Sequence, residues 1–300
     1  MSIDFILQQL ISGLAIGMAY ALIAIGYSMV YGILKFINFG HGAVYMAGTY
    51  MGYFLWLFFL DYMPTWPSFL LALVLAVLGA ALFGVLMERF AYRPTRGASR
   101  LTTFMSSVGM SFLVTYGMEF LVGPAPRPTP SLFPGVFFEI GKARVTGMQL
   151  FMFGVALVML LLLQWFVSST RMGKAIRATS EDMGTAALMG VNVNIPVSIT
   201  FAIGSGLGAI AGLLIGIYYS AIYPTMGWIA GIKGFVAAVT GGIGSIPGAM
   251  LGGVLLGLAE NLGAGFLSSG YRDAIAFVVL IIVMLFRPTG IFAREQRSSL

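Results

Sequence analysis

The sequence predicts an all-α fold, a polytopic bundle of transmembrane helices in a single domain over residues 1–300. Of the 300 residues, 59% are hydrophobic and only 9% are charged, whereas a soluble domain carries about 25% charged residues. The apolar residues form runs of about 20, the length that a helix needs to cross roughly 30 Å of hydrocarbon. Because these runs are continuously apolar, the alternating strands of a membrane β-barrel are excluded in practice.

Nine apolar runs are candidates to cross the membrane. The sequence before the first run carries Asp4 and no basic residue, and the run outlasts the core of a signal peptide, so we interpret it as a retained span. The seventh and eighth runs are short, rich in glycine and joined by the turn 241–248. They could be broken or re-entrant elements, which would leave eight crossings. The runs lie at residues 7–33, 42–60, 67–87, 101–122, 148–168, 197–220, 227–242, 246–264 and 272–287.

The basic residues predict the orientation. If the N-terminus lies outside and the nine runs alternate, eleven of the sixteen basic residues face the cytoplasm, the side that basic loops favour. We therefore predict an outer N-terminus and a cytoplasmic C-terminus. The cytoplasmic set is Lys35, Arg89, Arg93, Arg96, Arg100, Arg171, Lys174, Arg177, Arg287, Arg294 and Arg297. The outer set is Arg127, Lys142, Arg144, Lys233 and Arg272.

The segment from Arg171 to Pro196 is the long interior stretch that is polar and charged yet keeps helical spacing. We predict a short amphipathic helix there, on the cytoplasmic side. Such a helix is either a docking surface for a partner or a polar connector that lies on the lipid headgroups. The small and apolar residues that recur every three or four positions are Ile176, Thr179, Met183, Ala187 and Gly190.

Two further loops have a distinctive composition. The inner loop Glu88–Arg100 is short and strongly basic, and we interpret it as an anchor near anionic lipid that helps to set the orientation. The outer loop 123–147 contains five prolines, a density that forbids a continuous helix. We expect this outer loop to be an extended, lid-like segment.

Glycine accounts for 40 of the 300 residues and is regularly spaced in several runs. In the sixth run a glycine occurs at every fourth position, on one face of the expected helix. Such a row lets a second helix approach closely, so it predicts tight packing between helices of the chain. The row consists of Gly204, Gly208, Gly212 and Gly216.

Polar residues interrupt the apolar sequence between Tyr31 and Tyr50. Polar groups at membrane depth are costly, so they usually face a partner, a cavity or an interface. The only histidine, His41, could sense protons. We favour the interpretation that Asn38 and His41 satisfy unwound backbone at a helix break next to glycine. Lys233 and Glu260 are isolated charges near the ends of later apolar runs, and we expect them to snorkel or to pair.

Motifs for nucleotide binding and hydrolysis are missing. The sequence lacks G-x-x-x-x-G-K-[ST], H-E-x-x-H and G-x-S-x-G, contains no cysteine, and has no carboxylate cluster suited to a proton relay or a sodium site. We expect no catalytic residue, metal site or cofactor in this chain. The net charge of +6 comes from basic residues beside membrane runs, so we expect no nucleic-acid partner. If transport is powered, the motor is another polypeptide that attaches at the Arg171 segment.

Three segments, Tyr20–Tyr50, Arg171–Val193 and Val236–Glu260, together with FRPTGIF at Phe286–Phe292, resemble one family. It is the family of H-type permease subunits of high-affinity branched-chain amino acid ABC importers, and the resemblance covers nearly the whole chain. The chain departs from the pattern at Ala43, where relatives often have an acidic residue after the His-Gly pair. No role of that carboxylate is carried over.

The resemblance implies a five-component machine in a bacterial inner membrane. Its parts are this permease, a second homologous permease subunit, two ATPases that bind ATP and Mg²⁺, and a periplasmic substrate-binding protein. The substrate is a branched-chain or other neutral amino acid, or urea or a short amide, which relatives also import. The resemblance also makes residues 171–196 the coupling loop, which seats in an ATPase groove. Its assigned residues are Arg171, Gly173, Arg177, Glu181, Asp182, Ala186, Ala187 and Gly190.

We further hypothesise that polar and glycine residues of two segments border the translocation path near the middle of the membrane. A secondary transporter or channel is the alternative, but it would need ionisable residues deep in several spans or a ring of charge. An intramembrane enzyme would need a nucleophile and a base. We therefore favour a permease that is not itself an enzyme. The expected path residues are Asn38, His41, Gly42, Gly241, Gly242, Gly244 and Pro247.

Overall fold

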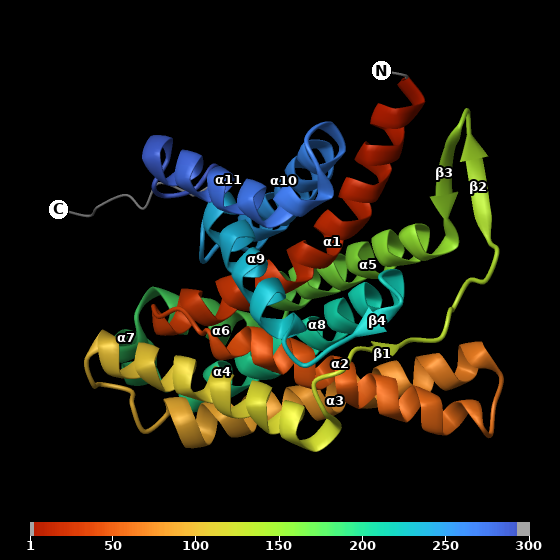
Figure 1. Ribbon diagram of the computed structural model, residues 1–300. Coiled ribbons are helices and arrows are strands. Elements are labelled where there is room, and N and C mark those ends of the chain that lie inside the picture. The colour runs from red at the N-terminus through yellow and green to blue at the C-terminus, as the bar shows by residue number, and fades with distance from the viewer. Residues whose placement is uncertain (1–2, 293–300) are drawn as a thin grey trace.

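The computed structural model describes residues 3–292, and helices make up most of it (Figure 1). Within these residues, eight helices are long and apolar enough to cross a membrane, which confirms the predicted all-α polytopic bundle. A ninth apolar helix, α9 (Met226–Gly241), has only 16 residues. The membrane-length helices are α1 (Ile3–Leu34), α2 (Gly40–Leu60), α3 (Thr65–Met87) with its π-helical extension η1 (Glu88–Tyr92), α4 (Arg100–Val122), α5 (Gly147–Ser169), α8 (Asn194–Tyr218), α10 (Ile246–Phe266), and α11 (Arg272–Phe286) with the 3₁₀ turn η2 (Ser269–Tyr271) before it.

The eighth apolar run is an unbroken helix. We considered a broken or re-entrant element there, but α10 continues for 21 residues and begins with a proline in its first turn. Proline is tolerated at that position because the first N–H groups of a helix have no partner within it. The glycines cluster instead in the turn before α10, where Gly242 and Gly244 have positive φ angles of 108° and 93°.

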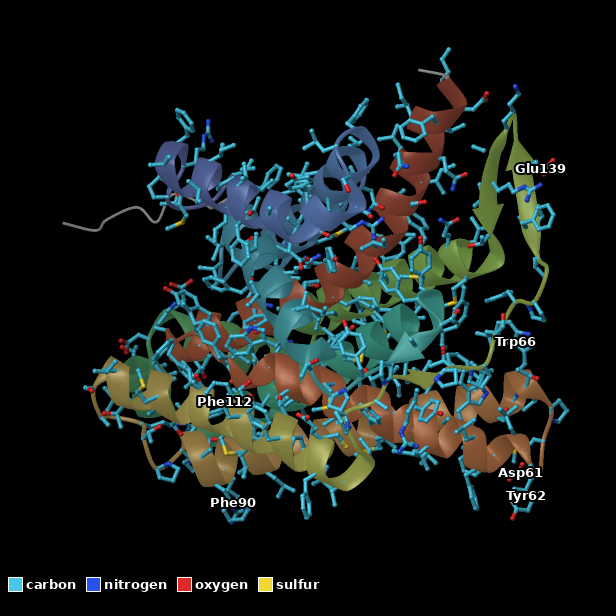
Figure 2. The ribbon with its side chains drawn as sticks, in the orientation of Figure 1. Asp61, Tyr62, Trp66, Phe90, Phe112 and Glu139 are labelled. Atoms are coloured by element: carbon cyan, nitrogen blue, oxygen red, sulfur yellow. The ribbon has the colours of Figure 1, made fainter. Side chains whose placement is uncertain are left out.

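The connections lie at two opposite ends of the bundle (Figure 1). One end carries α6 (Arg171–Glu181), α7 (Met183–Leu188) and the loop after η1. The last described residues pack against the last turn of α9, where Ile291 N–H donates to the carbonyl of Thr240 at 2.9 Å. The opposite end carries Asp61, Tyr62 and Glu139, as Figure 2 shows. Two residues of the predicted cytoplasmic set, Arg294 and Arg297, lie outside the described part of the chain.

The proline-rich loop is extended and forms no helix between residues 123 and 146. Its strand β1 (Arg127–Pro128) pairs antiparallel with β4 (Ala221–Ile222), which follows α8. Farther along, β2 (Phe137–Ile140) and β3 (Ala143–Thr146) form an antiparallel hairpin before α5. The loop is thereby attached to the end of α8.

Helices α1 and α8 form the centre of the bundle. In each of them 78% of the most apolar 18-residue window is buried, against 11% in α4 and in the η2–α11 segment. The glycine row of α8 lies at this centre. A Cβ at position 204 would lie 3.4 Å from the Cα of Gly26 in α1, and one at position 212 only 2.9 Å from the carbonyl oxygen of Tyr45 in α2. Small residues therefore permit the backbones to meet here.

Candidate functional site

The first helix of the coupling loop, α6, is amphipathic and leaves α5 through a tight corner. Thr170 caps it by accepting the N–H of Gly173 at 2.9 Å. On its buried face, Ile176 joins an apolar cluster with Val197 and Phe201 of α8. Lys174 is exposed on the opposite side. The helix is thus fixed on the bundle by its apolar face, and its charged face is free to contact a partner.

Two assigned coupling residues hold the corner between α5 and α6. A Cβ at Gly173 would lie 2.4 Å from the carbonyl oxygens of both Phe166 and Val167, so a side chain does not fit there. The Arg177 guanidinium donates to the Val167 carbonyl, at the C-terminal end of α5 where cations are favoured. Both residues position α6: Gly173 is buried, and Arg177 is exposed but bound to the end of α5.

The predicted single helix over the coupling loop is wrong, because the chain breaks at Asp182. This residue is extended, with φ −152° and ψ 116°, and its carboxylate accepts the N–H of Thr185 as the cap of α7. Aspartate side chains compete for backbone N–H groups in this way and so favour helix starts. The same backbone hydrogen bond lowers the pKa of Asp182, so its carboxylate is charged at neutral pH.

The break shifts the phase of the second helix. Ala187 and Gly190, which helical spacing placed on the packed face, are exposed, and Ala186 is buried instead. Gly190 ends α7 with φ +85°, its N–H donates to the Ala187 carbonyl and Val191 N–H donates to the Ala186 carbonyl, both at 3.0 Å. This is a Schellman helix stop, which requires a left-handed residue at the glycine position.

Two large apolar side chains project from the end of α7. Leu188 is 89% exposed and Met189 is 80% exposed. They directly precede the Gly190 stop, and the charged residues Glu181 and Asp182 precede α7. We call Leu188 and Met189 the apolar tip. The tip is not among the predicted site residues, although two bulky apolar residues within a polar segment are a usable signal. Leu188 and Met189 are adjacent and form one exposed apolar pair on an otherwise polar loop, which makes the tip a candidate docking point.

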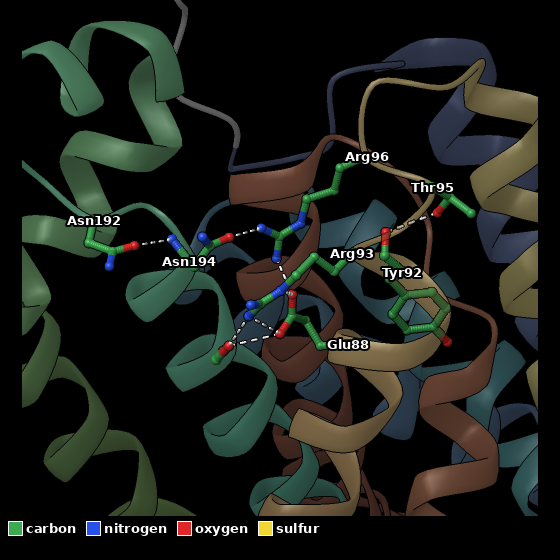
Figure 3. A network of polar contacts seen from close by, with 8 residues as sticks. Glu88, Tyr92, Arg93, Thr95, Arg96, Asn192 and Asn194 are labelled. Atoms are coloured by element: carbon green, nitrogen blue, oxygen red, sulfur yellow. Dashed lines mark hydrogen bonds and ion pairs between the residues drawn. The ribbon is translucent and has the colours of Figure 1, made fainter.

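A polar network joins the start of α8 to the connection between α3 and α4 (Figure 3). Glu88 is fully buried and forms salt bridges with Arg93 and Arg96. Ser198 Oγ donates to Glu88 Oε2 at 2.8 Å, and Arg96 Nη1 donates to Asn194 Oδ1 at 2.8 Å. Both arginines are therefore bound within the chain by one buried carboxylate, which balances one of their two charges, and the interpretation of this basic loop as a lipid anchor stays a prediction.

Asn38 lies just before α2 and His41 lies in its first turn, and their side chains make different contacts. Asn38 Oδ1 accepts the N–H of Gly40 at 3.1 Å and the Tyr92 hydroxyl at 2.7 Å, so Asn38 satisfies backbone at the break as expected. His41 does not, because it lies within α2 and its ring packs edge-on against Tyr27 at 4.8 Å. Its Nε2 atom has no hydrogen-bond partner among the described residues.

The remaining expected path residues pack against other parts of the chain. A Cβ at Gly42 would lie 2.2 Å from the Gly227 carbonyl oxygen of α9, and one at Gly241 would lie 1.8 Å from that of Gly248. Gly244 faces Gly32 in the last turn of α1. The structure thus brings Gly42 onto α9, but it gives Asn38 and Gly244 separate neighbours. Gly242 follows α9 directly, and Pro247 lies in the first turn of α10.

Lys233 and Glu260 form a buried ion pair, one of the two arrangements that we expected. Lys233 Nζ lies 3.0 Å from Glu260 Oε2 and 2.8 Å from Asp273 Oδ1. The Tyr20 hydroxyl donates to the same Glu260 oxygen at 3.0 Å. The cluster therefore joins α1, α9, α10 and α11. Asp273 and Tyr20 had no signal in the sequence, since Tyr20 is 240 residues from Glu260.

Comparison with known proteins covers the whole bundle. A family described as "branched-chain amino acid transport system / permease component" matches residues 9–284. The chain is 44% identical to the high-affinity branched-chain amino acid transport system permease protein BraD of Pseudomonas aeruginosa, over 97% of this chain and 96% of that protein. It is 42% identical to the corresponding protein LivH of Escherichia coli, over 97% of each. The fructose import permease protein FrcC of Rhizobium meliloti is 29% identical, over 51% of this chain and 42% of that protein.

Proposed function

The chain belongs to the family of branched-chain amino acid transport system permease components, and on this premise we propose that it is the membrane subunit of an ATP-driven importer for these amino acids. BraD of Pseudomonas aeruginosa and LivH of Escherichia coli, both named for branched-chain amino acids, match 97% of the chain at 44% and 42% identity, whereas the fructose permease matches about half of it at 29% identity. Leucine, isoleucine and valine are therefore the preferred substrates of the proposal. The chain itself provides the path and hydrolyses nothing.

The apolar tip is the observation that supports an external motor. Leu188 and Met189 are exposed on a loop at one end of the bundle, where water would surround them in an isolated chain. Burying both in a partner groove would stabilise the complex by about 1.5–3 kcal/mol each. An ATPase subunit is the partner that fits, since the chain carries no nucleotide-binding loop of its own.

The rest of the assembly follows from this assignment. We place the coupling loop in the cytoplasm, the N-terminus outside and the chain in the bacterial inner membrane. Two ATPases that carry ATP and Mg²⁺ bind from the cytoplasm, a second permease subunit completes the path, and a periplasmic binding protein delivers the substrate. ATPase closure moves α6 and α7, and the buried face of α6 passes the movement to α8 as a rigid body.

Uptake by the assembled complex tests the function. The permease is purified with its ATPases and second permease and reconstituted in liposomes, with the binding protein on the outer side. We expect uptake of radiolabelled leucine that requires ATP on the ATPase side, with little uptake of urea or fructose. ATP-independent leucine flux would contradict the proposal and favour a secondary transporter or channel. ATP-driven uptake of urea in place of leucine would overturn the substrate assignment.

Gly190 provides a test of the coupling loop. A Cβ at this position would have no heavy atom of the described chain within 4 Å, so a substitution acts through the backbone alone. Gly190→Val forces a branched residue to φ +85° at a cost of about 1–2 kcal/mol, which misdirects the chain after the tip. We expect lower leucine uptake per ATP hydrolysed. The control Gly190→Asn tolerates this conformation and should keep most of the uptake. Equal losses in both variants would contradict the explanation.

A further inference from the structure

A series of contacts, polar at both ends and joined in the middle by the backbone of η1, leads from the start of α8 after the coupling loop to the break between α1 and α2. It starts at Asn194 and Ser198, in the first turns of α8 directly after the loop. Arg96 connects Asn194 to Glu88, and Arg93 donates to Ser198 Oγ at 3.2 Å as well as to Glu88. The side chain of Glu88 is fully buried. Separating the start of α8 from Glu88 would remove the Ser198 hydroxyl from the buried carboxylate and leave it only Arg93 and Arg96 as partners, so these parts are expected to move together.

The next member of the series is the π-helix η1. Glu88 begins η1 and Tyr92 ends it, so one five-residue turn carries both contacts. Tyr92 is fully buried, and its ring lies 5.5 Å from the ring of Phe36 and 5.5 Å from that of Phe201. Short π-helical turns are rare and occur frequently at functional sites.

The series ends at the break between α1 and α2. Lys35 has a positive φ of 54°, and the chain is non-helical until Gly40. The Tyr92 hydroxyl donates to Asn38 Oδ1, which in turn accepts the first N–H of α2. A Cβ at Gly40 would lie 2.5 Å from the Tyr92 hydroxyl oxygen, so this approach requires glycine. A movement of η1 therefore acts directly on the start of α2.

We propose that η1, with Glu88 and Tyr92 as positioning residues, transmits movement of the coupling loop to the α1–α2 break. The proposal rests on the proposed function, because it needs a motor at the coupling loop. It adds a second route to the direct connection through α8, and it explains why a carboxylate, two arginines and a tyrosine hydroxyl are kept together at the edge of an apolar bundle. The first turn of α2, including His41 and Gly42, would then respond to ATPase closure.

The Tyr92→Phe variant tests the proposal in the full complex. It removes one hydroxyl and keeps the ring, so the apolar contacts with Phe36 and Phe201 remain. We expect the ratio of leucine transported to ATP hydrolysed to fall about fivefold to tenfold. This is the factor that corresponds to the net free energy of one buried hydrogen bond. The matched control is Ser68→Ala, which removes a buried hydroxyl that donates to the Thr65 carbonyl at 2.9 Å in the first turn of α3. This control should leave the ratio unchanged, because its hydroxyl is outside the series.

Further variants distinguish a loss of transmission through η1 from a general loss of stability. If Tyr92 acts through Asn38, then Asn38→Ala with Tyr92→Phe should lower the ratio no further than Asn38→Ala alone. Asn194→Ala breaks the exposed end of the series without disturbing the core, and it should also lower the ratio. An unchanged ratio in Tyr92→Phe and Asn194→Ala, or additive losses in the double variant, would overturn the proposal. A wild-type complex without ATP-driven uptake would instead defeat the proposed function, before any variant is compared.

Discussion

Replacing Leu188 and Met189 together by glutamate is expected to abolish ATP-driven leucine uptake while the permease stays in the membrane. The two side chains are 89% and 80% exposed, so the substitutions disturb no contact within the described chain. In the complex, however, they would place two carboxylates in an apolar groove. Losing one central apolar anchor of an interface costs about 2 kcal/mol or more, so two should weaken ATPase binding by at least a hundredfold. Co-purification of the ATPase with tagged permease measures this loss.

The matched control for the apolar tip is Leu101→Glu. Leu101 is 64% exposed and lies in the first turn of α4, so it is an exposed leucine outside the coupling loop. An acidic residue in the first turn of a helix is well tolerated. This variant should retain the ATPase and transport leucine. Normal ATPase recovery with the double glutamate variant would show that the motor attaches elsewhere.

Replacing Lys233 by methionine is expected to destabilise the permease by about 3–5 kcal/mol, the usual cost of removing one partner of a buried ion pair. The Lys233 side chain is 9% exposed and that of Glu260 only 1%, so water cannot take over the lost contact. The Glu260 carboxylate would keep the Tyr20 hydroxyl as a donor but would lose its nearest cation. Unfolding of the purified protein in mixed detergent micelles measures the effect.

A second substitution distinguishes lost charge balance from lost packing. In Lys233→Met with Glu260→Gln the buried charge is gone, and the amide oxygen still accepts from Tyr20. We expect this double variant to recover most of the lost stability, since replacing a buried pair by neutral groups of similar size is often neutral. If the double variant is as unstable as Lys233→Met, the ion pair is not the source of the effect, and packing of the long lysine side chain is.

The sequence predicted the helices well because hydropathy alone determines where a chain can cross a membrane. The expected run 42–60 corresponds to α2, and 246–264 corresponds to α10. The break at Asp182 was missed for a local reason. The spacing of small residues continues across it, and only the backbone shows that the carboxylate caps a new helix. A three- to four-residue period cannot distinguish one helix from two that differ in phase.

The polar part of the candidate site could be predicted only in outline. A polar residue in an apolar sequence predicts that its side chain has a partner, but the sequence does not identify that partner. Glu88 looked like one charge in a basic loop, yet its hydroxyl partner Ser198 is 110 residues away. Asn38 was expected to satisfy backbone at a helix break, but its contact with Tyr92 depends on how α3 ends. Such pairs arise from packing between distant helices, which composition and periodicity do not encode.

Cross-linking from position 188 tests the central claim, that the apolar tip seats in an ATPase subunit. The chain contains no cysteine, so Leu188→Cys introduces one unique thiol for a photoactivatable cross-linker. The complex is assembled in a membrane with both ATPases, the second permease and the binding protein, and then illuminated. The account predicts a cross-link to an ATPase subunit that changes in yield when ATP is added. Cross-links confined to lipid, to the binding protein or to the second permease would contradict it.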